Sequence, residues 1–113
     1  MLHSGRIHYD LLAEATKRDD RTTALVRLEQ YYPVPHDEMR AVLETYPNAE
    51  LVWAQDEPAN QGAAPFLLTA VYEAKQEADI KIVSRAASAS PAAGSAKKHQ
   101  AEQADLIQRA FER

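Results

Sequence analysis

The polar string Asp56–Gly62 is the part of the sequence best suited to directed hydrogen bonding. It follows the apolar run 51–54, which reads as an interior strand, and open α/β sheets bind ligands or partners where such strands end. Glu57 offers charged acceptors, while Asn60 and Gln61 each offer amide donors and acceptors. We therefore predict a site here that bonds to a neighbouring backbone. The alternative is a solvated turn with a helix cap.

A second polar group ends the β-rich segment 24–28. Glu29 and Gln30 close that segment, and Tyr31 and Tyr32 then lead into an exit stiffened by two prolines. Adjacent tyrosines in an extended segment point to opposite sides, so at least one is expected at the surface or against a partner. Like the string 56–62, this polar exit is a candidate contact surface.

A third group surrounds the segment 86–96, which consists of small residues and is predicted to be a loop. Arg85 precedes it, and Lys97 and Lys98 follow it. Together with backbone amides and the start of the last helix, these cations could hold an anion. The alternative is a flexible linker, and the residues alone favour neither.

The sequence contains no recognisable catalytic motif. Its four histidines lack the spacing that places two imidazoles on one metal ion; they are His3, His8, His36 and His99. The glycines are too scattered for a phosphate-binding loop, and no serine lies in a nucleophile-elbow motif. Asp56 resembles the acceptor of a phosphoryl-receiver domain, but the end of the first strand lacks the carboxylates that would hold a divalent cation. We predict neither catalytic nor metal-ligating residues.

The elements that must position these groups alternate between short strand-like runs and helical stretches, the pattern of an α/β domain. The predicted strands are residues 1–3, 24–28, 51–54 and 80–83. The predicted helices are residues 7–17, 36–46, 63–75 and 98–111. Residues 1–3 look like the tail of a longer strand, so we expect a truncated first strand.

Apolar spacing assigns an inward face to each helix, and Trp53 is expected in the core. The predicted inward residues are Ile7, Leu11, Leu12 and Ala15; Met39, Val42, Leu43 and Tyr46; Phe66, Leu67, Ala70 and Val71; and Ala104, Ile107 and Phe111.

Composition narrows the class of protein further. A chain of 113 residues has room for one domain, and its formal charge of −4 provides no general attraction for nucleic acid. The longest apolar runs are too short for a membrane span, which needs about 20 residues. With no cysteine in the sequence, a cytoplasmic location is expected.

Taken together, these segments resemble the C-terminal domain of the thiamine-diphosphate-dependent component of 2-oxoglutarate dehydrogenase, including its multifunctional decarboxylase form. The residues that carry the resemblance are Ser4–Ile7, Val26–Gln30, Pro33, Pro35, Trp53, Gln55–Ala63, Arg85, Ser88–Pro91, Gly94, His99 and Gln100. The resemblance implies a three-layer fold like the transketolase C-terminal domain. Its mostly parallel sheet would have four to five strands, with helices on both faces.

In that family the resemblance implies a scaffold role between domains and across a dimer, within an enzyme that decarboxylates 2-oxoglutarate. Thiamine diphosphate and magnesium would belong to the other domains, and no cofactor is expected in this chain. The residues expected to contact those domains or the dimer mate are Glu29, Tyr31, Glu57, Asn60, Gln61 and Arg85.

The alternative function is a regulatory module that binds acetyl-CoA or an adenine nucleotide. Its candidate residues are Gln30, His36, Arg40 and Lys97, near Arg85 and the small-residue loop. Asp37 and Glu38 argue against it, because a phosphate-bearing ligand needs cations at that position.

Overall fold

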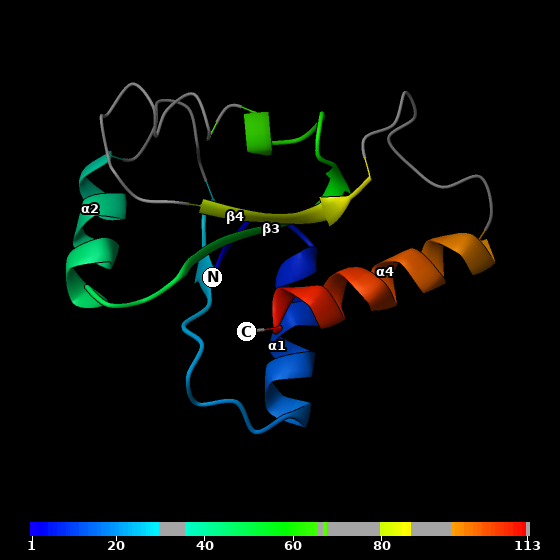
Figure 1. Cartoon of the computed structure of the whole chain (residues 1–113), viewed down its shortest axis with the longest axis horizontal. Coiled ribbons are helices and arrows are strands. Elements are labelled where there is room, and N and C mark those ends of the chain that lie inside the picture. Colours follow the sequence, from blue (N-terminus) through cyan, green and yellow to red (C-terminus); the bar gives the residue numbers. More distant parts are fainter. Residues whose placement is uncertain (30–35, 66, 68–79, 87–95, 113) are drawn as a thin grey trace.

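The computed structural model describes residues 1–29, 36–65, 67, 80–86 and 96–112, and Figure 1 shows the arrangement of their elements. Four parallel strands form one sheet in the order β2-β1-β3-β4. They are β1 (Leu2–His3), β2 (Val26–Arg27), β3 (Leu51–Pro58) and β4 (Ile80–Arg85). The predicted α/β class with a largely parallel sheet is therefore confirmed.

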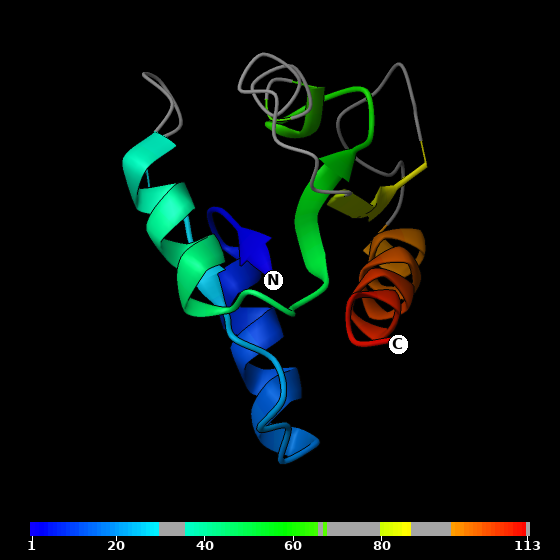
Figure 2. The ribbon, with the colours of Figure 1, turned by 60° about the vertical axis from the view of Figure 1, so that its left-hand side comes forward.

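Among the described residues, three helices cover the sheet: α1 (Ile7–Lys17), α2 (His36–Thr45) and α4 (Ala96–Ala110). Helices α1 and α4 lie on one face and pack with Val52, Ala54 and Val83 of the sheet. Helix α2 contributes to the other face, where Leu2, Trp53 and Leu67 form a second cluster. Figure 2 shows α2 and α4 on opposite sides of the strands, which gives the expected three layers.

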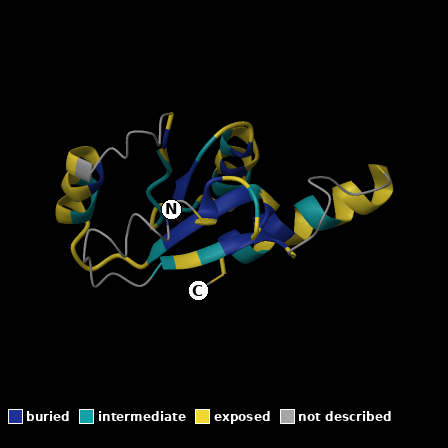
Figure 3. Cartoon of the chain, turned by 90° about the horizontal axis from the view of Figure 1, so that it is seen from above, coloured by how far each residue is buried: buried dark blue, intermediate teal, exposed yellow. Residues whose placement is uncertain are grey.

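The core lies where these layers meet on the two central strands. Figure 3 shows the buried residues concentrated along the strands, with exposed residues on the outer faces of the helices. Trp53 is only 1% exposed, which confirms its predicted place in the core. None of the helices within the described residues has the length and apolarity that a membrane span requires.

Strand β3 is longer than predicted. It continues through Pro58, so Asp56 and Glu57 belong to the strand and not to the loop expected from residue 56 onwards. The pairing with β4 shifts register between Ala54 and Pro58, and this irregularity lets polar residues extend the strand beyond its apolar run. In contrast, β2 covers only two residues of the segment 24–28.

Three of the predicted inward residues that the structure describes are exposed. Leu12 is 48% exposed because it lies about 140° around the axis of α1 from the buried Ile7. Tyr46 is 47% exposed because α2 ends one residue before it. Ala104 is also exposed, whereas the predicted Ile107 and Phe111 are buried together with Leu106 and Ala110. Helix α4 begins at Ala96, not near Lys98 as predicted.

Part of the prediction falls outside the described residues. Of the helix expected over 63–75, only Ala63–Pro65 and Leu67 are described, and Leu67 is fully buried. Gln30, Tyr31 and nearly all of the loop 86–96 also lie outside them.

Candidate functional site

The carboxyl ends of β1, β3 and β4 meet at one side of the sheet, as parallel strands require. We call this side the carboxyl edge and define it by residues 3–6, 55–62 and Arg85, with the start of α4 beside it. Two of the three polar groups singled out in the sequence therefore lie together: the string 56–62 and Arg85. The direct link is a backbone hydrogen bond of 3.1 Å from Ala59 N–H to the Arg85 carbonyl.

Gln55 is the centre of the first part of this edge. Its side-chain Oε1 accepts hydrogen bonds from Trp53 Nε1 at 2.9 Å and from the backbone N–H of Ala64 at 3.0 Å. Its Nε2 donates to the carbonyls of Glu57, Pro58 and Gln61 at 3.2, 2.8 and 2.9 Å. Gln55 is only 2% exposed, and its bonds to Trp53, Pro58 and Ala64 are buried, so the amide fixes the course of the turn.

The turn fixed by Gln55 is tight. Gly62 has a φ of +65°, and a Cβ built at this position would lie 2.9 Å from Glu57 Oε2 and 3.3 Å from Gln55 Oε1. Glycine therefore serves both the backbone conformation and the close approach of two side chains. At the surface, this turn exposes Glu57 and Asn60, while Gln61 is half-buried.

Arg85 occupies the second part of the edge and is only 7% exposed. One terminal nitrogen donates to Gln103 Oε1 at 2.8 Å, and the other donates to Glu102 Oε2 at 3.1 Å and to His99 Nδ1 at 3.0 Å. All three partners lie on α4, so the arginine fastens this helix to the end of β4. Arg85 Nε has no hydrogen-bond partner among the described residues, so one donor is not used by them.

Gln103 extends this connection to two further elements. Its Nε2 donates to Asp10 on α1 and to Asp56 on β3, both at 2.9 Å. Beside these side chains lies a cavity of about 140 Å³, lined by Arg6, Asp10, Asp56, Glu57, Arg85, His99 and Gln103. This lining is dense in charge of both signs, and no group of three potential metal ligands occurs among the described residues.

His3 ends β1 at the same edge and is fully buried. Its Nε2 lies 2.8 Å from Nδ1 of His8, and the two rings stack with centroids 5.0 Å apart. Burial lowers the pKa of His3 from 6.5 to about 4, with a further contribution from neighbouring His8. His3 is consequently neutral at physiological pH and serves as a packed part of the edge.

The candidate effector residues do not gather at this site. Arg40 is exposed on α2, and Lys97 is exposed at the start of α4. Figure 1 shows these two helical segments at opposite ends of the longest axis. The side chain of His36 and all of Gln30 lie outside the described part, and Arg85 uses both terminal nitrogens on α4.

Glu29, one of the expected contact residues, is exposed just after β2. Sequence reasoning missed Gln103 and Asp10, and it noted Gln55 only within the family resemblance. For Gln55 a signal was present. Residues two apart in a strand share a face, so a glutamine two positions after a core tryptophan points into the core and needs buried partners.

Comparison with known proteins adds the deciding observation. A family model described as "2-oxoglutarate dehydrogenase C-terminal" matches residues 1–111. The chain belongs to this family. The predicted resemblance to the C-terminal domain of 2-oxoglutarate dehydrogenase is thereby confirmed.

Similar proteins carry related names. The chain is 44% identical to a 2-oxoglutarate dehydrogenase E1 component of Cupriavidus necator over 96% of its own length. It is also 44% identical to a multifunctional 2-oxoglutarate metabolism enzyme of Mycolicibacterium vanbaalenii over 98% of its length. The chain spans only 12% and 9% of these two relatives, respectively. It thus corresponds to a small part of much longer proteins.

Proposed function

We propose that this chain works as a scaffold domain of a 2-oxoglutarate dehydrogenase E1 component, joining other domains of the enzyme within a subunit and across a dimer. The whole enzyme would decarboxylate 2-oxoglutarate, with thiamine diphosphate and magnesium held by those other domains. A cytoplasmic location, suggested by the cysteine-free sequence, is part of the same proposal.

The observation that carries the proposal is the turn fixed by Gln55. Five hydrogen bonds to one buried amide hold the turn before any partner arrives. Glu57 and Asn60 are then exposed on a rigid support, so docking would order few further groups. Such preorganised polar groups suit a permanent contact with a neighbouring domain.

The second part of the edge supports the same role. Gln103 and Arg85 connect α4 with α1, β3 and β4, so the elements beside the turn move as one unit. The charged cavity next to Glu57 provides further polar groups for the same neighbour. Arg85, Gln61, Glu29 and Tyr31 remain predicted contacts. The effector module has no comparable support, because its candidates Arg40 and Lys97 lie on separated elements.

The test uses the Cupriavidus necator E1 component from which the matching C-terminal region has been deleted. We expect the full chain to bind this deleted enzyme and restore decarboxylation of 2-oxoglutarate. Glu57→Ala/Asn60→Ala should weaken binding at least about tenfold, since two exposed polar contacts are lost.

The matched control is Glu44→Ala/Asn48→Ala, which removes the same two residue types from exposed positions at and just after the end of α2. This control should bind like the parent chain. Equal binding by both double variants would overturn the assigned contact surface. Decarboxylation by the chain alone, with thiamine diphosphate and magnesium added, would overturn the scaffold role.

A further inference from the structure

Strand β4 is the last strand of the sheet that the described residues form. Within them it pairs only with β3, and Figure 2 shows it on the side of β3 away from β1, next to α4. Its other side is an outer edge, where backbone N–H and C=O groups provide pairing positions for a further strand. We call this side the β4 edge.

The directions of two carbonyl groups identify the residues of the β4 edge. The Arg85 carbonyl accepts a hydrogen bond from the N–H of Ala59, which directly follows β3. Successive carbonyls of a strand point to opposite sides, so the Ser84 carbonyl points away from β3. By the same alternation, the backbone groups of Ile82 share the outward direction of Ser84. The β4 edge is therefore defined by residues 82 and 84.

A cavity of about 460 Å³ lies beside this edge. Its lining includes Ile82 and Ser84 on β4 and Glu102, Asp105 and Arg109 on α4. The three α4 residues are three and four positions apart, so they share one face of the helix. The cavity thus separates the outward backbone groups of β4 from a charged helix face, in the position that an added strand would take.

Arg109 closes this position from the α4 side. Its Nη2 donates a hydrogen bond of 2.8 Å to the Ser84 carbonyl, and its Nε donates one of 2.8 Å to Asp105. The bond to Asp105 joins residues four apart on the same helix and orients the guanidinium. Arg109 therefore occupies the acceptor that the N–H of a neighbouring strand would otherwise use.

We propose that the β4 edge is a strand-pairing surface that Arg109 holds closed, and that the partner it excludes is β4 of a second copy of this chain. Charged side chains over a strand edge protect proteins against such pairing, and the exposed Lys81 in the same strand is a second protection of this kind. Ile80, Ile82 and Val83 are β-branched, which favours pairing once the edge is open.

The symmetry of the edge favours a second copy as the partner. Two copies present the same row of backbone groups, so antiparallel pairing of two β4 strands would satisfy both edges at once. This pairing needs only the chain itself and does not depend on the proposed function.

Removing Arg109 tests the closed edge. In Arg109→Ala the Ser84 carbonyl loses its donor, and the α4 side of the cavity becomes wider. We expect the dissociation constant for self-association, measured by sedimentation equilibrium, to fall at least about tenfold relative to the parent chain. Amide hydrogen exchange at Ile82 and Ser84 should slow as the concentration of this variant rises, because these N–H groups then pair between copies.

The matched control is Arg18→Ala. Arg18 also forms an ion pair with a carboxylate four residues away, Glu14, and its side chain is 38% exposed compared with 39% for Arg109. The control therefore makes the same change in net charge and removes the same kind of ion pair, but it leaves the β4 edge unchanged. Its self-association should equal that of the parent chain.

A second variant, Asp105→Asn, keeps the arginine but weakens the contact that orients it. We expect its dissociation constant to fall by about twofold to threefold, and urea denaturation shows whether each variant is folded. If Arg109→Ala does not fold, then Asp105→Asn decides, and an unchanged dissociation constant would overturn the proposal.

For a folded Arg109→Ala, self-association as weak as that of the parent chain would overturn the proposal. An equal increase in Arg18→Ala would do the same, because the effect would then follow net charge. Tighter association without slower exchange at Ile82 and Ser84 would also contradict it, since the copies would then meet at another surface.

Discussion

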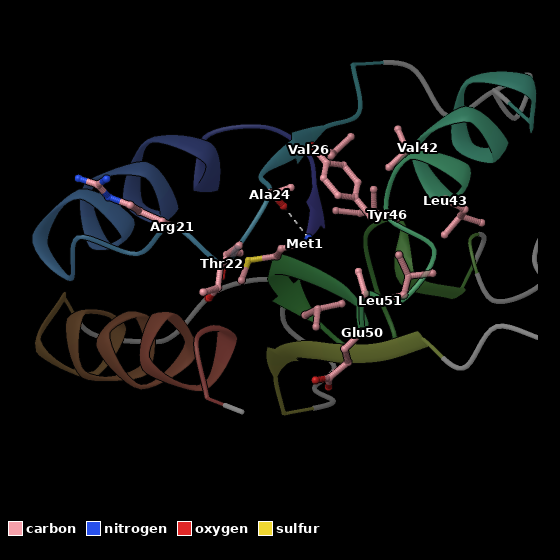
Figure 4. Close-up of a pocket in the computed structure, with 14 residues that line it drawn as sticks. Met1, Arg21, Thr22, Ala24, Val26, Val42, Leu43, Tyr46, Glu50 and Leu51 are labelled. Atoms are coloured by element: carbon pink, nitrogen blue, oxygen red, sulfur yellow. Dashed lines mark hydrogen bonds between the residues drawn. The ribbon is translucent and has the colours of Figure 1, made fainter.

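The two ends of the sheet differ in how far their side chains find partners within the chain. At the carboxyl edge, the side chains of Gln55, Arg85 and Gln103 form hydrogen bonds of 2.8 to 3.2 Å. These bonds connect α1, β3, β4, α4 and the turn that follows β3. At the other end, where the strands begin, apolar side chains such as Leu43 and Tyr46 line a cavity of about 360 Å³, here called the amino-end groove (Figure 4). The carboxyl edge is held together by polar contacts within the chain, whereas the amino-end groove leaves apolar surface uncovered.

This difference has a physical cause. Buried polar groups cost free energy unless they have partners, so the carboxyl edge needs the many internal hydrogen bonds that Gln55, Arg85 and Gln103 supply. Apolar surface needs no directed partner, and removing it from water is favourable whichever apolar group covers it. We therefore expect stability to depend on single residues at the carboxyl edge and on coverage at the amino-end groove.

The largest effect is expected for Gln55→Leu. The substitution keeps the approximate size of the side chain but leaves the buried Trp53 Nε1, the Ala64 N–H and three carbonyls without their partner. We expect the free energy of unfolding to fall by about 4 kcal/mol, measured by urea denaturation. Gln108→Leu, at an exposed position of α4, should change it by less than about 0.5 kcal/mol. A loss below about 1 kcal/mol for Gln55→Leu would remove the proposed dependence of this edge on one residue.

The next effect is a dependence on pH that His3 imposes at the carboxyl edge. The unfolded chain protonates this imidazole below pH 6.5, whereas the folded chain resists protonation until about pH 4. Stability is therefore lost as the pH falls through this window, by about 2 kcal/mol between pH 7.5 and pH 5. Urea denaturation at both pH values should show that His3→Leu loses less stability on acidification than the parent chain. The same pH dependence in both proteins would contradict the assignment.

A smaller effect should separate two glycines with positive φ. Gly5, with a φ of +79°, has open space around it, whereas Gly62 faces Glu57 and Gln55. Alanine at residue 5 should cost about 1 kcal/mol for the backbone conformation alone. At residue 62 the cost should reach about 1.5 to 2 kcal/mol, because Glu57 can move aside but the anchored Gln55 cannot. Thermal or urea unfolding of both variants measures the difference, and equal costs would show that the turn is looser than its contacts indicate.

The smallest effect is expected at the amino-end groove. Tyr46 is 47% exposed, so Tyr46→Ser should reduce the free energy of unfolding by less than about 0.5 kcal/mol. Urea denaturation checks this value. A loss above about 2 kcal/mol would mean that the groove wall is already an essential part of the core, and the contrast between the two ends would disappear.

Local sequence patterns predicted the secondary-structure elements well where a continuous apolar run is buried on both faces. Val52, Trp53 and Ala54 form an apolar run, and a run of this kind becomes an interior strand under most arrangements of its neighbours. Helix faces were predicted less well. Leu12 and Ala104 fit an apolar spacing, but which part of a helix surface turns inward depends on the elements packed against it.

The candidate site shows the same limit. The string Asp56–Gly62 was recognisable because several hydrogen-bonding side chains follow one another. The partners of Arg85 were not, since they lie 14 to 18 residues away along the chain and come within reach only after α4 packs on the sheet. Gln103 and Asp10 are 93 positions apart, so no local pattern could pair them.

The amino-acid sequence by itself determined the α/β class, the buried Trp53 and the polar composition of the segment after β3, because these follow from side-chain type and short-range spacing. Only the tertiary structure decided that Gln55 fixes the turn, that Arg85 bonds to α4 and that apolar side chains line a groove where the strands begin. Each of these depends on the distance between segments that the chain brings together, and that distance is set by packing and strand register.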